Sequence, residues 1–263
     1  MDILKRSIAP LTEEAWNEVD DRAVEVLHSH LSARKVVHVE GPKGWDYTVV
    51  PEGRLELVDN EKDVKTGVYK STPLVEARIS FELDRWEMDN IVRGAKDVEL
   101  EALEDAVHKL AVFEEEAIYN GYEKGQIKGL KESSEQETLS FGEDAKSILE
   151  MVAKGVIMLQ DAFVGKPYNL VVGDEAWKRI NRESNNYPLV KQVEELIGGK
   201  VVYSKVVNGA FLLPEAHEDL EMTIGQDYSI GYESHTDEKV RLFITESFAF
   251  RVLDPALIIN FNV

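Results

Sequence analysis

Residues 97–122, DVELEALEDAVHKLAVFEEEAIYNGY, are the stretch that decides the fold. The stretch contains no proline and no glycine before Gly121, so nothing interrupts a helix until its end. Apolar side chains recur in it at helical spacing and define one stripe: Leu100, Leu103, Val107, Leu110, Ala111 and Ile118. Such a helix would be roughly 39 Å long. We predict a central amphipathic helix against which the elements on both sides of it in the chain pack.

The acidic residues of this helix are predicted to lie largely off the apolar stripe. Asp97 is expected to cap the first turn, where free backbone N–H groups favour an acceptor. The run Glu114–Glu116 is expected to form a solvated face, with a carboxylate metal cluster as the weaker alternative. His108 and Glu104, one turn apart, are interpreted as a solvated pair.

A second amphipathic helix is predicted near the N-terminus. Thr12 is a good N-cap, and Leu11 and Trp16 occupy the two positions of a hydrophobic staple. The helix should continue to about Ser32, with apolar side chains at helical spacing: Trp16, Val19, Ala23, Val26, Leu27 and Leu31. This spacing is compatible with simple core packing and with a groove that receives a peptide from another protein.

Strand-forming runs lie on both sides of the central helix. Residues 34–44 contain a short strand closed by a Gly/Pro turn, and two further runs occupy residues 47–85, joined by the polar stretch 59–65. These two runs contain little that closes a core of their own, so we predict that residues 49–73 form an arm that reaches another subunit. Apolar and polar residues alternate in VRLFITESFAFRV, residues 240–252, which predicts a strand with one buried face.

A compact α/β unit is predicted after a segment rich in glycine, serine and charge, residues 121–144. We expect helices over 144–163, 174–182 and 188–197, and strands over 168–172 and 200–204. The polar loop 181–189 is expected at a surface or a pore. The fold class is therefore α+β.

The composition excludes several classes of protein. The chain has 263 residues, 43% of them apolar, and no cysteine, which rules out a disulfide framework and thiolate chemistry. No apolar run approaches the length of a membrane span. A formal charge of −20 disfavours binding to the phosphate backbone of nucleic acids and to anionic membranes. We expect a cytoplasmic protein whose partners include neither nucleic acid nor membrane.

No catalytic or metal site is predicted. The motifs HExxH, GxSxG and Walker A do not occur in the sequence. The six histidines are scattered along the chain: His28, His30, His38, His108, His217 and His235. The protein is therefore expected not to be an enzyme.

Five segments together resemble one family, the encapsulins, which are shell-forming proteins also called linocin-type bacteriocins. The segments are LKRSIAPLTEEAWNEVD at 4–20, EGPKGWDY at 40–47, LDRWEMDN at 83–90, GQDYSIGYE at 225–233 and VRLFITESFAF at 240–250. The resemblance implies the HK97-like fold of tailed-phage major capsid proteins. Its parts would be a peripheral domain (1–48, 74–130 and 218–263), an extended β-arm (49–73) and an axial domain (131–217).

The resemblance also implies a function. Encapsulins assemble into closed icosahedral shells, of about sixty copies in the smallest case. These shells enclose cargo enzymes such as a ferritin-like protein or a dye-decolorising peroxidase, which serve iron storage or oxidative-stress chemistry. A short cargo peptide docks in an apolar groove between the N-terminal helix and the peripheral sheet. The matching positions here are Leu27, Leu31, Arg34, Val37 and Ile230.

These positions have alternative interpretations. Each aliphatic residue is equally compatible with core packing, whereas Arg34 beside an apolar groove suits a ligand carboxylate or a neighbouring acid. Arg78, Trp86 and Tyr187 match positions where shells of this family can hold a flavin, which would not be required. Alternatively, Trp86 packs against the arm and Tyr187 lines a pore loop.

Two rival functions remain open at this point. A phage or prophage major capsid protein would share the fold, but a start directly in an amphipathic helix and a strongly acidic chain favour the encapsulin. A bacteriocin or protease, as the older family label suggests, is disfavoured because the sequence contains no catalytic motif.

Overall fold

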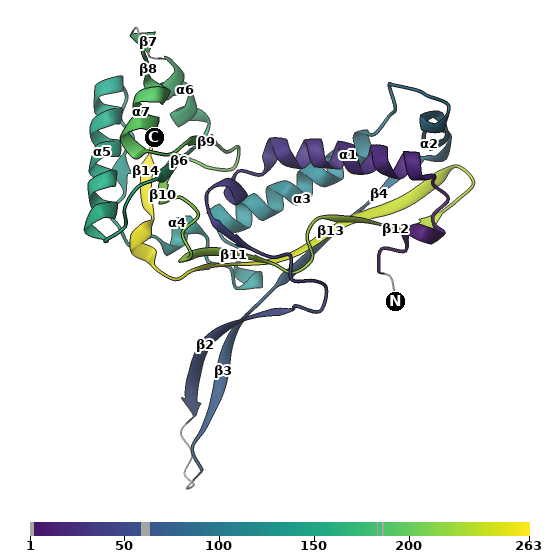
Figure 1. Ribbon diagram of the computed structural model, residues 1–263, viewed down its shortest axis with the longest axis horizontal. Helices are drawn as coiled ribbons and strands as arrows, with labels where there is room; N and C mark the ends of the chain where they lie inside the picture. The colour runs from purple at the N-terminus through teal and green to yellow at the C-terminus, as the bar shows by residue number, and fades with distance from the viewer. Residues whose placement is uncertain (1–2, 59–63, 183, 186) are drawn as a thin grey trace.

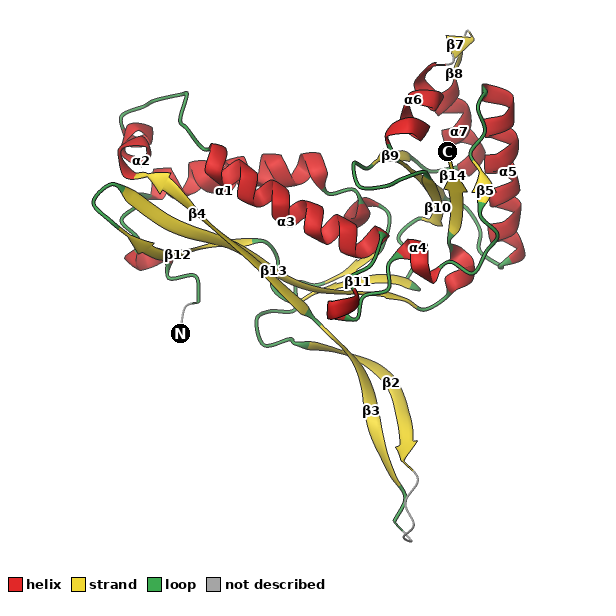
Figure 2. Ribbon diagram, turned by 180° about the vertical axis from the view of Figure 1, so that it is seen from behind, coloured by secondary structure: helices red, strands yellow, loops and turns green. Residues whose placement is uncertain are grey.

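The computed structural model describes residues 3–58, 64–182, 184–185 and 187–263. A long sheet carrying two helices lies beside a compact α/β unit, and a two-stranded arm projects away from both (Figures 1 and 2). Among the described residues, no helix combines the length and apolarity that crossing a bilayer requires.

Each segment that was predicted to be helical contains a helix in the structure. They are α1 (Glu13–His30), α2 (Arg85–Val92), α3 (Glu101–Tyr119), α4 (Leu130–Ser133), α5 (Ala145–Asp161), α6 (Asp174–Arg182) and α7 (Leu189–Ile197). Short 3₁₀ turns are η1 (Arg6–Ile8), η2 (Ala33–Lys35), η3 (Glu123–Gly125) and η4 (Pro255–Leu257).

Within the described residues, the strands form two five-stranded sheets and two hairpins. They are β1 (His38–Glu40), β2 (Val49–Val58), β3 (Thr66–Pro73), β4 (Val75–Asp84), β5 (Leu139–Ser140), β6 (Tyr168–Val172), β7 (Ser184–Asn185), β8 (Tyr187–Pro188), β9 (Val201–Tyr203), β10 (Ala210–Pro214), β11 (Leu220–Ile224), β12 (Ser229–His235), β13 (Lys239–Val252) and β14 (Ile259–Asn262). The hairpins are β2–β3 and β7–β8.

The long sheet is organised around β13. This strand pairs antiparallel with β4, with β12 and with β11, while β1 adds to β11 in parallel. Helices α1 and α3 lie together across one face (Figure 1). Because β13 is central, its middle is buried on both sides: Phe243, covered by the Arg78 guanidinium 4.3 Å from its ring, is as inaccessible as Ile244 on the helix side. The prediction of a single buried face is therefore wrong for the middle of this strand.

The two main helices begin differently from one another. Thr12 caps α1 as predicted, because its Oγ1 accepts a hydrogen bond from Ala15 N at 3.2 Å. Helix α3 starts at Glu101, so Asp97 lies too far upstream to cap it. Glu99 takes that role, since its carboxylate accepts the N–H of Glu101 at 3.0 Å. The predicted cap was wrong because the backbone becomes helical only after Leu100, which is buried.

The compact α/β unit contains the sheet β5-β14-β10-β6-β9 with α5, α6 and α7 packed on it. Its predicted elements are confirmed, including β6 and α6 at the residues expected. The C-terminal strand departs from the prediction that residues 218–263 belong with the long helix. Strand β14 pairs with β10 and β5, and its Phe261 ring contacts Phe141 with centroids 6.0 Å apart. The last strand of the chain therefore closes the core of the α/β unit.

The arm is a hairpin of β2 and β3, paired from Val49 with Pro73 outward to Val58 with Thr66. Its sequence lies where the arm was predicted, and residues 59–63 of the predicted connection lie outside the described residues. Apolar side chains on the arm are strongly exposed, including Leu57 at 76%, Val68 at 63% and Tyr69 at 81%. Exposed apolar side chains of this extent are typical of a surface that another chain covers. That the arm reaches another subunit stays a prediction.

Candidate functional site

A groove runs between the second half of α1 and the start of β12. It consists of two adjoining cavities of about 530 and 240 Å³, which share Val24, Leu27 and Tyr228. The larger is lined by Val24, Leu27, His28, Leu31, Arg34, Lys35, Asp227 and Tyr228. The smaller is lined by Leu4, Arg6, Asp20, Ala23, Val24, Leu27, Tyr228, Ser229, Ile230 and Ile244.

The groove exists because α1 is only partly covered along its apolar face. Trp16 and Val19, near its start, are buried against the core that also contains Ile230 and Ile244. Ala23 is buried in the same core, whereas Val24, on the flank of this stripe, is 49% exposed. A helix that leaves apolar side chains uncovered beside a cavity can receive a peptide with matching apolar side chains.

Of the residues predicted to bind cargo, the groove brings four together. Leu27, Leu31 and Arg34 line it directly, and Ile230 contributes to the smaller cavity while remaining 4% exposed. Val37 does not line it: this residue is 2% exposed and belongs to the core beneath η2. The position of Val37 therefore fits the alternative interpretation, in which this side chain packs in the core. Whether any of these residues contacts cargo stays a prediction.

Sequence reasoning missed several lining residues. Val24 extends the stripe of Leu27 and Leu31 at helical spacing, so the pattern contained its signal. Asp227 and Tyr228 lie inside the segment GQDYSIGYE that carries the family resemblance. Their place opposite α1 depends on the pairing of β12 with β13, which no local pattern shows.

Arg34 closes one end of the groove through ion pairs. Its guanidinium contacts the Glu114 carboxylate at 2.5 Å, Asp227 at 2.8 Å and Glu246 at 3.3 Å. The guanidinium also lies over the Tyr228 ring, 4.8 Å from its centroid. Of the two possibilities left open for Arg34, the structure shows neighbouring acids.

Burial determines the pKa shifts in the cluster that Arg34 forms with Glu114, Asp227 and Glu246. Glu114 and Glu246 are fully inaccessible, and Oε1 of Glu246 has no hydrogen-bond partner among the described residues. Burial raises the pKa of Glu246 well above its ordinary value, and the nearby Glu114 charge raises it further. Burial lowers the pKa of Arg34, but the pairs with Glu114 and Asp227 outweigh it and raise that pKa overall. The geometry therefore pairs Arg34 most closely with Glu114, while Glu246 takes up a proton more readily than an exposed glutamate does.

The acidic run of α3 differs from its predicted solvated face. Glu114 and Glu115 are 0% and 2% exposed, whereas Glu116 is exposed as expected. The prediction failed because η2 and the end of α1 cover this turn of α3. Arg34 compensates Glu114, and the backbone N–H groups of Ser32 and Ala33 bind Glu115 at 2.8 and 2.7 Å.

The three predicted flavin residues are not brought together within one chain. Arg78 lies on β4, paired with Glu76 at 2.9 Å. Trp86 lies in the first turn of α2 and is 66% exposed, while Tyr187 lies on β8 at the far tip of the α/β unit (Figure 1). A flavin site made of all three would therefore need more than one subunit. The flavin stays a prediction.

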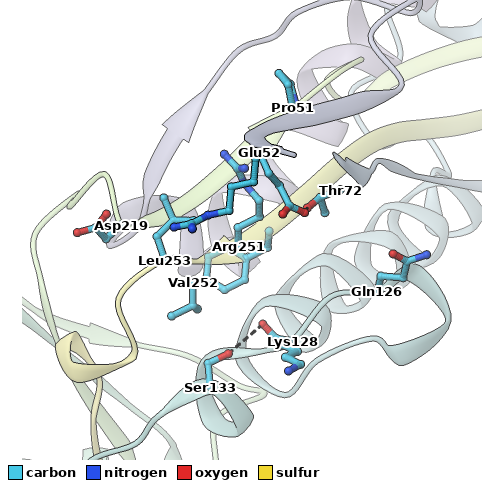
Figure 3. Close-up of a pocket in the computed structure, with 12 residues that line it drawn as sticks. Pro51, Glu52, Thr72, Gln126, Lys128, Ser133, Asp219, Arg251, Val252 and Leu253 are labelled. Atoms are coloured by element: carbon cyan, nitrogen blue, oxygen red, sulfur yellow. Dashed lines mark hydrogen bonds between the residues drawn. The ribbon is translucent and has the colours of Figure 1, made fainter. Parts of the chain in front are cut away.

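A second large cavity lies at the root of the arm, with a volume of about 680 Å³ (Figure 3). Charged and polar side chains dominate its lining, among them Glu52 and Thr72 of the arm, Lys128 after α3, and Arg251 of β13. Arg251 is held by Glu221 at 2.6 Å. Pro51, Phe250, Val252 and Leu253 also line it, but polar and charged side chains outnumber them, so the cavity suits an apolar cargo peptide less well than the groove does.

The described residues include no group of three or more histidine, aspartate or glutamate side chains arranged to hold a metal ion. His30 and His108 do approach each other, with ring centroids 4.4 Å apart. His108 was predicted to pair with Glu104. In the structure His108 contacts His30 of α1 instead. Glu104 instead accepts a hydrogen bond from Arg22 at 2.7 Å.

Comparison of the folded chain with solved structures shows which fold this is. A virus-like particle from Pyrococcus furiosus has a TM-score of 0.66 at 14% sequence identity, covering 93% of this chain and 98% of that one. The capsid protein of an empty GTA particle has a TM-score of 0.56 at 13% identity, covering 88% and 90%. The predicted α+β, HK97-like capsid fold is confirmed.

Comparison of sequences identifies the family. The sequence profile of the family described as "Encapsulating protein for peroxidase" matches residues 1–249. The type 1 encapsulin shell protein of Rhodococcus erythropolis is 32% identical over 259 residues, with 98% of both chains covered. That of Rhodospirillum rubrum is 33% identical over 264 residues, covering 97% of this chain and 94% of the relative. The chain belongs to the encapsulin shell protein family.

Proposed function

We propose that this encapsulin shell protein assembles in the cytoplasm with about sixty copies of itself into a closed icosahedral shell and encloses a cargo enzyme. The groove between α1 and β12 would bind a short peptide of that cargo on the inner wall. The description of the family points to a peroxidase as the class of cargo, which would place the compartment in oxidative-stress chemistry. The role of the shell protein itself is structural.

The observation that carries this proposal is the match between the groove and the positions that the family resemblance implies. Leu27, Leu31 and Arg34 lie around one cavity of about 530 Å³, a volume that accommodates several peptide side chains. The apolar side chains would anchor the peptide, and the charged end at Arg34 would limit its register.

A loading experiment tests the proposal. The shell protein is expressed with a fluorescent reporter that carries the last ~30 residues of a peroxidase encoded by the same organism. We expect particles with icosahedral symmetry in electron microscopy, and co-purification of the reporter with them. The same reporter without the added segment is the control. Closed particles that exclude both reporters would contradict the proposed cargo, and a monomeric protein would contradict the proposed shell.

A charged substitution on the arm should block assembly without unfolding the subunit. Leu57 and Tyr69 are 76% and 81% exposed, so Leu57→Glu and Tyr69→Glu remove no buried contact within the chain. If the arm packs on a neighbouring subunit, the introduced carboxylate would be buried there without a partner. Size-exclusion chromatography should show small oligomers with unchanged circular dichroism. Glu56→Gln on the same strand is the control, and normal shells from both charged variants would show that the arm is not an interface.

A ferritin-like cargo, for iron storage, is the alternative that the same loading experiment can test with a second reporter. A flavin held between subunits by Arg78, Trp86 and Tyr187 would give the purified shells a visible absorbance. Neither is required for the shell and cargo functions proposed above.

A further inference from the structure

A third cavity continues the groove toward the start of α1. Its volume is about 430 Å³, and its lining includes Glu13, Trp16 and Asp20 of this helix. The smaller cavity of the groove is lined by the next turns of α1, and the two cavities share Arg6 and Asp20. Three cavities therefore follow one another along α1, from Glu13 to Leu31.

Arg6 stands between the second and the third of these cavities. Its guanidinium donates a hydrogen bond to Asp20 at 2.7 Å and lies over the Trp16 ring, 4.0 Å from the centroid. Arg6 belongs to the N-terminal segment, residues 3–9, which precedes α1. This contact therefore joins two parts of the chain across the line of the groove.

The N-terminal segment that carries Arg6 lies beside β12 and is weakly held (Figure 1). The N–H of Tyr232 donates to the Leu4 carbonyl at 2.8 Å, but η1 contributes no buried residue, and Ile3 and Ile8 are 42% and 65% exposed. The two side chains of the Arg6 ion pair are themselves 31% and 40% exposed, and such pairs contribute little to stability. A segment with these properties opens locally at low cost.

Arg6 occupies a site that suits a guanidinium group in particular. A planar cation binds an aromatic face by stacking and a carboxylate at its edge by charge-assisted hydrogen bonds. Trp16 supplies the face and Asp20 the carboxylate, and Glu13 adds a second acidic side chain in the third cavity. With Arg6 turned away, this part of α1 would present one ring and two carboxylates, a surface that attracts a cation.

We propose that a bound peptide places an arginine between Trp16 and Asp20 and displaces Arg6, which joins the three cavities into one groove. The exchange replaces one guanidinium by another, so the Asp20 charge keeps a partner. Arg6 thereby competes with the peptide for its own site, and a peptide without an arginine does not displace it. This inference rests on the peptide-binding function proposed above and adds the class of side chain that the groove selects.

The length of α1 along the groove sets the length of the peptide. Between Asp20 and Leu31 the helix rises about 16 Å, which an extended peptide spans with about five residues. Between Glu13 and Leu31 it rises about 27 Å, or about eight residues of extended peptide. The arginine should therefore lie about five to seven residues from the apolar side chain that contacts Leu31.

A small probe tests the guanidinium site without any cargo. Argininamide is added to the purified, cargo-free protein, and saturation-transfer NMR measures its contact with the protein. Arg6→Ala vacates the site, so the transfer should rise at least about threefold, and adding Asp20→Asn should remove this rise. Arg22→Ala is the matched control: Arg22 is also ion-paired on α1, with Glu25 at 2.6 Å, but the described residues place no aromatic ring beneath it.

Citrullinamide, whose side chain has nearly the same shape and no charge, should show the same weak transfer to every variant. Equal transfer from argininamide to the Arg6→Ala and Arg22→Ala proteins would overturn the proposal. Circular dichroism checks that each variant folds. Should Arg6→Ala not fold, the rise is required of Arg6→Gln, which keeps a side chain over Trp16 but carries no charge.

A loading experiment connects the site to cargo. The reporter carries a peptide with an arginine about six residues from its apolar anchor. Arg6→Ala shells should bind it about three- to tenfold more tightly than unchanged shells, because the competing side chain is gone. Glutamine in place of the peptide's arginine should abolish this gain.

The two experiments can fail independently. Argininamide that fills the vacated site while no reporter ever loads would refute the cargo groove and leave the guanidinium site in place. A reporter that loads equally well into unchanged and Arg6→Ala shells, with argininamide finding no site, would refute this inference and leave the cargo groove in place.

Discussion

Arg34→Met should lower the free energy of unfolding by about 3–5 kcal/mol, because it leaves the buried Glu114 side chain without its cation. Glu114 is inaccessible to water, and the Arg34 side chain that pairs with it is itself only 18% exposed. For a chain of this size, the expected drop in melting temperature of the assembled shell is about 10 °C. Differential scanning calorimetry measures it.

Arg22→Met is the matched control for this variant. Arg22 also makes two ion pairs, with Glu25 and Glu104 at 2.6 and 2.7 Å, but its side chain is 42% exposed. Solvent screening limits such pairs, so its loss should lower the melting temperature far less than the loss of Arg34 does. Adding Glu114→Gln to Arg34→Met should recover part of the lost stability, since it removes the uncompensated charge. Equal losses from Arg34→Met and Arg22→Met would show that burial does not govern this cluster.

The elements that the sequence predicted well have strong local signals. Helix α1 was placed by Thr12 and by its apolar spacing, and β6 and α6 by a short apolar run followed by a polar helix start. The arm was predicted because its two strand-forming runs have no core of their own, and its exposed Leu57 and Tyr69 fit that reasoning.

The residues that sequence reasoning misjudged depend on contacts between distant parts of the chain. Glu114 was expected to be solvated because it belongs to a run of three glutamates; its partner Arg34 lies 80 residues away, and Glu246 lies 212 residues from Arg34. Strand β14 was assigned to the wrong unit for the same reason, since its neighbours β10 and β5 are fixed by tertiary packing. The spacing of apolar residues predicts which face of a helix or strand is buried. It does not predict which distant residues will pack over a polar side chain.

This distinction also decides which groove variant is informative. Ile230 is 4% exposed and belongs to the core beneath α1, so a charge there would damage the sheet as well as the groove. Val24 is 49% exposed at the junction of the two cavities, so Val24→Asp changes the groove surface while removing little buried area. The effect of Val24→Asp on cargo loading can therefore be told apart from an effect on folding, which is not possible for a charge at Ile230.

Val24→Asp should abolish cargo loading while shells still form. A bound peptide would bury the new carboxylate among Leu27, Leu31 and Tyr228, a cost of at least ~2 kcal/mol, or about 30-fold in affinity. Asp20, one turn earlier on α1, adds like-charge repulsion. The reporter retained per shell, measured by fluorescence after gel filtration, should fall to the level of the reporter without its peptide. Val92→Asp, at a position on α2 that is 53% exposed and outside the groove, should load normally. If both variants load like the unchanged shell, cargo binds elsewhere, because residue 24 lines both cavities of the groove.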